Sequence, residues 1–164
     1  MTRYARIETP LGTMIAVSRN GSIVALDFED AKYAPAIGED WIEDRAVPLL
    51  RNCAAQLAEY FDGERGRFDL PLAPRGTPFQ QRIWQEISRV PFGETITYAE
   101  LAARAGSPGS ARAAGSATGR NPLAIVVPCH RIVGASGALT GYAGGLARKA
   151  RLLALEGEPA RDAA

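Results

Sequence analysis

The stretch TYAELAARAGSPGSARAAGSATG, residues 97–119, decides the fold of the C-terminal half of this chain. Thr97 and Glu100 have the spacing of a capping box, which opens a helix, and Ser110 is placed to cap a second one. The Gly/Pro-containing turn at 106–109 separates the two helices. Two short helices joined by a tight turn predict a helix-turn-helix.

The second helix of this pair is unusual because only Ala, Gly, Ser and Thr surround Arg112. Small side chains permit the close approach of another surface, which is either a neighbouring helix or the groove of a nucleic acid. The composition of the helix is compatible with either of these two surfaces. The position of Arg112 near the helix start favours nucleic acid, because its side chain would reach a duplex without steric competition.

The charge distribution also favours a polyanionic partner. The formal net charge is only +1, yet no Asp or Glu occurs between Leu101 and Leu155. This segment holds the basic residues Arg104, Arg112, Arg120, Arg131, Arg148, Lys149 and Arg151. Such a segment is typical of nucleic-acid binding, although a solvated face of scattered arginines would have the same composition.

Length and composition indicate a globular protein of one or two domains. The 164 residues are 46% hydrophobic and 23% charged, and no apolar run is long enough to span a bilayer. The start of the chain lacks a secretory signal, and two cysteines are too few for a disulfide framework. We therefore expect a cytoplasmic protein with free thiols and no membrane partner.

The N-terminal part predicts a small antiparallel sheet. Alternating apolar residues mark strands at 2–9, 13–19 and 22–28, and Asn20-Gly21 predicts a hairpin turn. A helix is expected next, from about Val47 to Phe61, with Cys53 packed in the core. The proline-rich segment FDLPLAPRGTP then connects the halves. The expected parts are a scaffold domain at 1–72, a domain that contains the helix-turn-helix at 77–157, and a tail at 158–164.

Three further elements are expected in the C-terminal half. Thr77-Pro78 opens a helix, LAIVV at 123–127 forms a buried strand, and a last helix ends at Glu156-Gly157. The first helix would bury Phe79, Ile83, Trp84, Ile87 and Val90, and the last would bury Leu146, Ala150, Leu153 and Ala154.

The most reactive side chains follow the expected strand. Pro128 should end it, so that Cys129 lies exposed in a turn beside His130, the chain's only histidine. A thiol beside an imidazole indicates a nucleophile with its base, but this pair alone is a weak signal and an inert buried thiol stays open. Neighbouring side chains tend to point to different sides, and a water between these two would connect them; Glu156 is the expected carboxylate partner of His130.

The C-terminal half resembles the O6-alkylguanine-DNA alkyltransferases, also called methylated-DNA:protein-cysteine methyltransferases. The motifs that carry the resemblance are Asn-Pro at 121–122, Pro-Cys-His-Arg-Ile-Val at 128–133 and Leu-Glu-Gly at 155–157. It is strong over residues 77–157 and weak over the N-terminal sheet and helix. It implies an α+β fold, in which a small ribonuclease-H-like domain with an antiparallel sheet and a helix packs on a mostly helical domain that contains the helix-turn-helix.

The resemblance also implies a role for each matching residue. Cys129 would accept the alkyl group, His130 would draw its proton through a bound water, and Glu156 would hold His130. Asn121 would support the turn, and Tyr98 would help rotate the nucleotide and donate a proton toward the departing base. The remaining positions are Arg112 as the finger that enters the base stack; Gln80, Ala99, Ser107, Arg120 and Ala135 at the DNA backbone; and Tyr142, Ala143, Gly144 and Gly145 in the wall of the base pocket.

The implied activity is direct reversal of DNA damage. O6-alkylguanine, with O4-alkylthymine as an open second substrate, would be flipped out of double-stranded DNA from the minor groove without sequence preference. The thioether on Cys129 has no good leaving group, so we expect a single turnover. We expect a monomer in solution that needs no cofactor; cooperative binding to DNA stays open. One His and two Cys cannot form a tetrahedral zinc site.

Two other functions fit parts of the pattern. A non-catalytic alkyltransferase-like lesion sensor would bind the same DNA, but such proteins lack the acceptor cysteine. A cysteine hydrolase would use the same thiol and imidazole, but the sequence gives no sign of an oxyanion hole. Arg131 has no step in the transfer, and we expect it either to brace the cysteine turn or to contact a phosphate.

Overall fold

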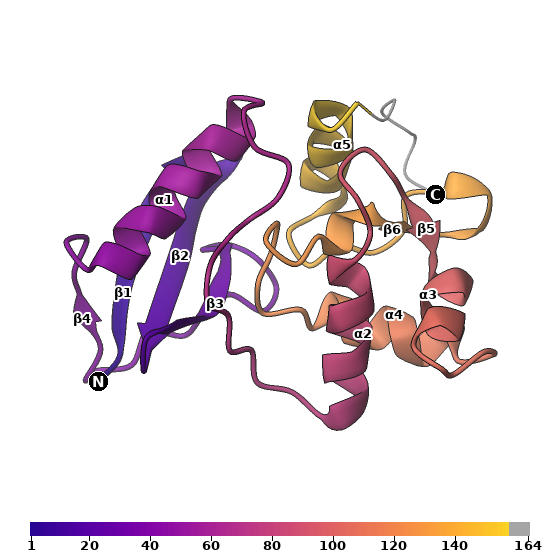
Figure 1. Ribbon diagram of the computed structural model, residues 1–164, viewed down its shortest axis with the longest axis horizontal. Coiled ribbons are helices and arrows are strands. Elements are labelled where there is room, and N and C mark those ends of the chain that lie inside the picture. Colours follow the sequence, from indigo (N-terminus) through magenta and orange to yellow (C-terminus); the bar gives the residue numbers. More distant parts are fainter. Residues whose placement is uncertain (158–164) are drawn as a thin grey trace. The chain divides into compact units, whose positions relative to one another are not determined.

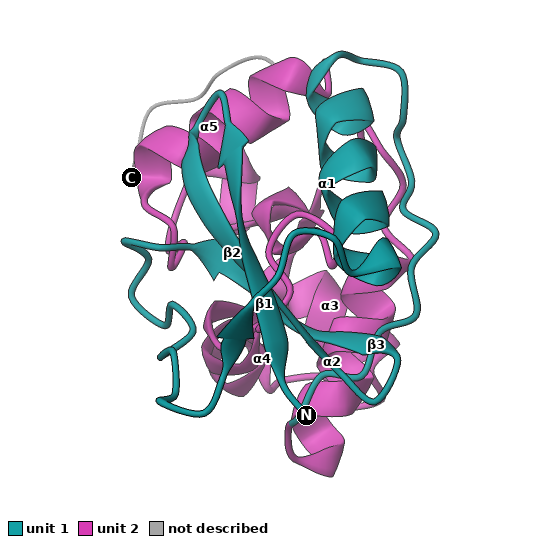
Figure 2. Ribbon diagram, turned by 90° about the vertical axis from the view of Figure 1, so that its left-hand side faces the viewer, with its two compact units in different colours: residues 1–75 teal, residues 76–164 magenta. Residues whose placement is uncertain are grey.

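The computed structural model describes residues 1–157 and has the expected α+β fold. The chain divides into two compact units, Met1–Arg75 and a second that begins at Gly76 (Figure 2). The predicted tail at 158–164 lies outside the described residues. Over the described part of the chain, no helix is both long enough and apolar enough to cross a membrane.

The first unit is built on a four-stranded sheet with the strand order β3-β2-β1-β4 (Figure 1). The three predicted strands are confirmed as β1 (Arg3–Thr9), β2 (Gly12–Arg19) and β3 (Ser22–Phe28), which pair antiparallel. Asn20 and Gly21 have φ values of 53° and 78°, as the predicted hairpin turn requires. The short β4 (Ile42–Glu43) pairs parallel to β1 and was not predicted, because two residues carry no recognisable pattern.

Helix α1 (Pro48–Phe61) packs along one face of this sheet (Figure 1). Its bounds agree with the prediction, with a proline in the first turn and Gly63, at φ 78°, just after the end. Cys53 lies fully buried on the inner face of α1, and burial raises the pKa of its thiol to about 12. The prediction that Cys53 is a core residue is confirmed, and its thiol stays protonated at neutral pH.

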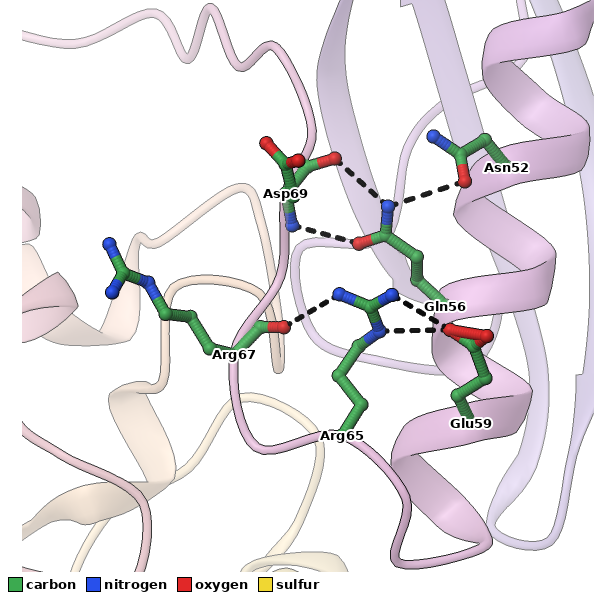
Figure 3. A network of polar contacts seen from close by, with 6 residues as sticks. All are labelled: Asn52, Gln56, Glu59, Arg65, Arg67 and Asp69. Carbon is green, nitrogen blue, oxygen red and sulfur yellow. Dashed lines mark hydrogen bonds and ion pairs between the residues drawn. The ribbon is translucent and has the colours of Figure 1, made fainter.

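Side-chain hydrogen bonds fasten the chain after α1 to this helix (Figure 3). The buried Gln56 accepts from the backbone N–H of Asp69 at 2.8 Å and donates to the Asp69 carbonyl at 2.9 Å. Arg65 donates to the Glu59 carboxylate through Nε and Nη2 and to the Arg67 carbonyl through Nη1. These bonds order a segment that has no regular secondary structure.

The second unit is mostly helical. Its elements are α2 (Pro78–Ser88), β5 (Ile96–Thr97), α3 (Tyr98–Arg104), α4 (Ala111–Gly119), the 3-10 turn η1 (Cys129–Arg131), β6 (Ile132–Val133), the 3-10 turn η2 (Ala135–Gly137) and α5 (Leu146–Leu155). Strands β5 and β6 pair parallel. Thr77 and Gln80 form a capping box on α2, and Thr97 and Glu100 form the predicted one on α3. Of the five side chains that were predicted to be buried with the first helix, only Phe79 stays partly exposed, and it lies beneath the Arg82 guanidinium.

Helices α3 and α4 pack on each other and are joined by the predicted turn. Ser110 occupies the predicted N-cap position of α4, but its side chain makes no capping hydrogen bond. Trp84 of α2 donates through Nε1 to the carbonyl of Ala117 at 2.9 Å, which fixes α4 against α2. Helix α4 buries Ala114, Ala117 and Thr118 and exposes Arg112, Ala113 and Ser116. The small residues therefore serve internal packing on one face and leave the other face free.

The predicted strand at 123–127 is wrong. These residues form a buried turn, in which Ile125 has a φ of 70°, and the strand β6 comes after the cysteine instead. A short apolar run indicates burial but cannot distinguish a strand from a buried turn. Here the side chain of Asn121 forms hydrogen bonds with the backbone of Leu123 and Val127. In a sheet, a neighbouring strand would bind these backbone groups.

The core face of α5 also differs from the prediction. Ala154 is exposed, and Leu146 and Ala150 are only partly buried. The buried side chains are Lys149, Leu152, Leu153 and, directly after the helix, Glu156. Their spacing is that of one helical face, but two of the four are charged, so a search for apolar residues does not find this face.

Candidate active site

Cys129 begins η1 and is only 7% exposed, so the expectation of an exposed turn is wrong. Pro128 occupies the N-cap position of η1. The Cys129 N–H donates to the Val127 carbonyl at 2.8 Å, and the Arg131 N–H donates to the Pro128 carbonyl at 2.9 Å. The thiol therefore lies at a tight backbone turn inside the unit.

Asn121 holds the backbone that leads into this turn. Its Nδ2 donates to the carbonyl of Val127 at 2.8 Å, and its Oδ1 accepts from the N–H of Leu123 at 2.9 Å. The side chain is buried, so these bonds replace water for groups that would otherwise be unsatisfied. Asn121 thus lies where the expected supporting role requires it.

His130 and Glu156 form a completely buried pair, with 2.7 Å between Nε2 and Oε2. Burial alone would raise the pKa of Glu156, but hydrogen bonds from His130 and Arg131 outweigh this effect and hold the pKa at about 2. Burial also lowers the pKa of His130, against the opposing effect of Glu156. An ionised carboxylate can only accept, so Nε2 carries the proton of a neutral imidazole.

The other ring nitrogen of His130 keeps its lone pair. Nδ1 is buried and has no hydrogen-bond partner among the described residues. Glu156 fixes the tautomer through Nε2, as carboxylates do for histidines that must present the opposite nitrogen as a base. The pair therefore supplies a basic nitrogen next in the chain to the Cys129 thiol.

Arg131 binds the same carboxylate. Its Nε lies 2.8 Å from Oε1 of Glu156 and its Nη2 lies 3.0 Å from Oε2, which is the bidentate geometry of strong Arg–carboxylate pairs. Nη1 donates to the carbonyl of Val90 at 2.7 Å, and the guanidinium lies over the ring of Phe92. Because Arg131 is buried and its guanidinium is engaged, it braces the cysteine turn and is not placed to bind a phosphate.

Tyr98 opens α3 and connects it to the loop before α5. Its hydroxyl donates to the carbonyl of Thr140 at 2.9 Å. Burial raises the pKa of this hydroxyl, so it keeps its proton at neutral pH. The expected pocket wall follows Thr140 in the chain, with Tyr142, Ala143 and Gly144 half-buried and Gly145 exposed at the start of α5.

The residues expected to contact DNA come from several surface elements. Ala99, Ser107 and Arg112 lie on α3, in the turn after it and on α4, while Arg120 follows α4. Ala135 begins η2, and Gln80 lies in the first turn of α2, where its side-chain oxygen accepts from the N–H of Thr77. Ala99, Arg112, Arg120 and Ala135 are exposed; Gln80 and Ser107 are partly exposed.

Lys149 also faces this site, although the sequence singled it out only as one of the basic residues between Leu101 and Leu155. It is fully buried and lies close enough to Cys129 and His130 for its charge to affect both groups. The signal that could have found it is its helical spacing from Leu152 and Leu153, the apolar residues on the core face of α5.

Known protein families match both units of the chain. A family model described as the DNA binding domain of 6-O-methylguanine DNA methyltransferase matches residues 78–158. The model of the ribonuclease-like domain of the same enzyme matches residues 2–74. The N-terminal resemblance, which is weak in the sequence motifs, thus extends over the whole first unit.

Individual relatives match over nearly the full chain. A methylated-DNA--protein-cysteine methyltransferase from Mycolicibacterium paratuberculosis is 45% identical over 95% of this chain and 93% of its own length. One from Methanosarcina barkeri is 45% identical over 93% of this chain and 96% of its own. The crystal structure of Mycobacterium tuberculosis OGT in complex with DNA has a TM-score of 0.88 and 43% identity, and the match covers 96% of each chain. The chain therefore belongs to the 6-O-methylguanine DNA methyltransferase family.

Proposed function

We propose that this protein repairs DNA directly, as a methylated-DNA--protein-cysteine methyltransferase that moves the alkyl group from O6 of guanine to Cys129. The observation that carries the proposal is the buried His130–Glu156 pair, which presents a neutral base next to the Cys129 thiol; His130 and Cys129 share one 3-10 turn. Relatives that bear this name at 45% identity support the same activity.

The reaction uses these side chains to move one proton and one alkyl group. Cys129 gives its proton toward Nδ1 of His130 through a bound water, and Glu156 stabilises the imidazolium that forms. The sulfur bonds to the alkyl carbon while the bond between that carbon and O6 breaks, and the electron pair stays with the guanine. The guanine takes up a proton from Tyr98, and the imidazolium of His130 gives its proton back to Tyr98 through water, so the thiol proton is transferred to the guanine overall. The thioether cannot leave, and one molecule therefore repairs one lesion.

DNA binding uses the exposed face of α4 and the turn that joins it to α3. These two helices act as a helix-turn-helix whose small exposed residues, Ala113 and Ser116, let α4 approach the minor groove. The lesion is inside the duplex, so the nucleotide must be extruded at a cost of a few kcal/mol, and Arg112 replaces the extruded base in the stack. The backbone contacts are Gln80, Ala99, Ser107, Arg120 and Ala135, and residues 142–145 form the pocket wall.

Incubation with a duplex that contains a single O6-methylguanine tests the activity. We expect the Cys129 peptide to gain one methyl group in one-to-one yield, whereas the Cys53 peptide gains none because that thiol is buried and protonated. Mass spectrometry of the digested protein measures both peptides in one sample. Tight binding with no modification would instead indicate a lesion sensor, and repeated turnover would indicate a hydrolase.

Arg112→Ala should slow repair of duplex DNA by about tenfold or more, since losing 1.4 kcal/mol or more of help with extrusion has that effect on a rate. Methyl transfer from the free base O6-methylguanine should stay unchanged, because a free base needs no extrusion. Arg104→Ala is the matched control, since it removes an exposed arginine from the neighbouring helix α3. Equal losses on both substrates would place Arg112 in the pocket or the fold instead.

A further inference from the structure

A cavity in the first unit takes no part in the proposed reaction. Its volume is about 470 Å³, which is within the range usual for ligand pockets. Residues 5–8 of β1 form one wall, and Leu50, Arg51 and Ala54 of α1 form the other, with Arg45 beside them. We call this cavity the edge groove. None of its residues belongs to the candidate active site, so a ligand bound here would occupy a separate site.

The strand wall of the edge groove is an unpaired edge of β1. Strand β4 pairs only with Arg3 and Tyr4, and the Tyr4 carbonyl accepts from the N–H of Asp44 at 2.9 Å. Backbone groups alternate in direction along a strand, so the N–H and C=O of Arg6 and Glu8 point to the same side as the Tyr4 carbonyl. Among the described residues, none pairs with them on that side. Such an edge can pair with another strand.

The chain itself turns away from this edge. After β4, the N–H of Ala46 donates to Oδ1 of Asp44 at 2.9 Å, whereas in a longer strand it would donate to the backbone of β1. Pro48 then begins α1. The edge groove is therefore the position that a continued β4 would occupy beside residues 6–8.

The charge of the edge groove favours an acidic ligand. Acidic residues outnumber basic residues in the first unit, yet Arg6, Arg45 and Arg51 line the groove against the single acid Glu8. Arg6 is paired with Glu43 at 3.2 Å, but Arg45 and Arg51 are exposed and form no ion pair with a described residue. Arg51 lies in the first turn of α1, where the helix dipole adds positive potential. A carboxylate in the groove would thus meet two guanidinium groups that lack an acidic partner.

We infer that the edge groove binds an extended, acidic peptide segment of another protein, which adds to β1 as a strand in line with β4. The backbone of the peptide pairs with Arg6 and Glu8, and its carboxylates lie near Arg45 and Arg51. A nucleic acid matches the charge of the groove but has no ladder of N–H and C=O groups for the strand edge. This inference does not rest on the proposed function.

Nuclear magnetic resonance of the isotope-labelled, unmutated chain tests the site. The probe is the end-blocked peptide Glu-Val-Glu-Val-Glu, added to millimolar concentration, and Lys-Val-Lys-Val-Lys is the control. The acidic peptide should shift the amide signals of Arg6 and Glu8 and slow their hydrogen exchange by about tenfold or more, because both N–H groups become hydrogen-bonded. The basic peptide should do neither. Unchanged signals and exchange at Arg6 and Glu8 with the acidic peptide would overturn the inference.

The same spectra distinguish the edge groove from other sites and other occupants. Acidic-peptide shifts confined to α3 and α4 would show that the peptide only replaces DNA there. An undamaged DNA duplex should shift signals of α3 and α4 and leave β1 unchanged; shifts at residues 5–8 would make the groove a nucleic-acid site. Signals of β1 that change with protein concentration alone would indicate a second copy of the chain. Each of these three results would contradict a peptide site.

Arg51→Glu should weaken binding of the acidic peptide by about tenfold, because it replaces an attraction with a repulsion inside the groove. Arg67→Glu is the matched control, since it reverses the charge of an exposed arginine in the same unit but outside the groove. Its affinity should stay within about twofold of that of the wild type. Equal losses in the two variants would mean that the peptide responds only to the total charge of the unit.

Substitutions of Glu8 separate the charge from the backbone. Glu8→Gln removes a negative charge but keeps the N–H, so the acidic peptide should bind more tightly. Glu8→Pro removes the same charge and also the N–H at the open edge, which an edge strand tolerates because the ladder with β2 does not use that group. The Pro variant should bind at least about tenfold more weakly than the Gln variant. Equal binding by two folded variants would show that the peptide does not add to β1, and amide exchange in the unmutated chain decides the point if the Pro variant does not fold.

Discussion

Cys129→Ala should bind alkylated duplex DNA as the wild type does and accept no alkyl group at all. The sulfur is the atom to which the new bond forms, and no neighbouring side chain can replace it: the only other thiol, Cys53, lies buried in the first unit. Binding should persist because the residues expected at the DNA lie on α2, α3, α4 and η2, whose backbones do not depend on one sulfur atom.

Two measurements decide this prediction. Electrophoretic mobility shifts compare the affinity of both proteins for a duplex with one O6-methylguanine, and mass spectrometry follows the methyl group. Cys53→Ala is the control, which should retain full transfer and lose only some stability through the small cavity in its core. Methyl transfer that survives in Cys129→Ala would overturn the assignment of the nucleophile.

Local signals in the sequence predicted local structure well. Asn20-Gly21 fixes its turn through the positive φ values that Asn and Gly tolerate, and Thr97 with Glu100 closes hydrogen bonds within four residues. The failures occurred where tertiary contacts decide. The apolar residues 123–127 would fit a buried strand and a buried turn equally well. Only the hydrogen bonds of Asn121 show that this segment is a turn.

In the candidate site, too, the features visible in the sequence were predicted and some tertiary contacts were not. Cys129, His130 and Arg131 are adjacent in the sequence, and Glu156 stood out because acidic residues are so scarce in this half of the chain. The sequence did not show that Arg131 shares Glu156 with His130, because nothing in the motif indicated which group the guanidinium would bind. The inward position of Lys149 was hidden because a lysine is expected to face solvent.

Arg131→Met should destabilise the protein by about 3–5 kcal/mol, the usual cost of leaving one member of a buried ion pair without its partner. Glu156 would lose both of its bonds from the guanidinium, and the Val90 carbonyl would lose the donor Nη1. The exposed ion pair of Arg89 with Glu86 provides the control, since Arg89→Met should cost at most about 1 kcal/mol. Urea unfolding at pH 7 compares the two variants.

The pH dependence of the stability that Arg131→Met loses identifies the cause of the loss. The pKa of Glu156 is about 2 in the folded protein and 4.5 as an isolated group, so the carboxylate contributes stability that is complete above pH 4.5 and disappears as the pH falls toward 2. The difference between the wild type and Arg131→Met should therefore be largest at neutral pH and shrink below pH 4.5. Adding Glu156→Gln to Arg131→Met removes the buried charge and should recover part of the stability at pH 7. If this double variant is no more stable than Arg131→Met, the loss comes from the packing of Arg131 on Phe92 and from its bond to Val90, and the unpaired carboxylate is not its cause.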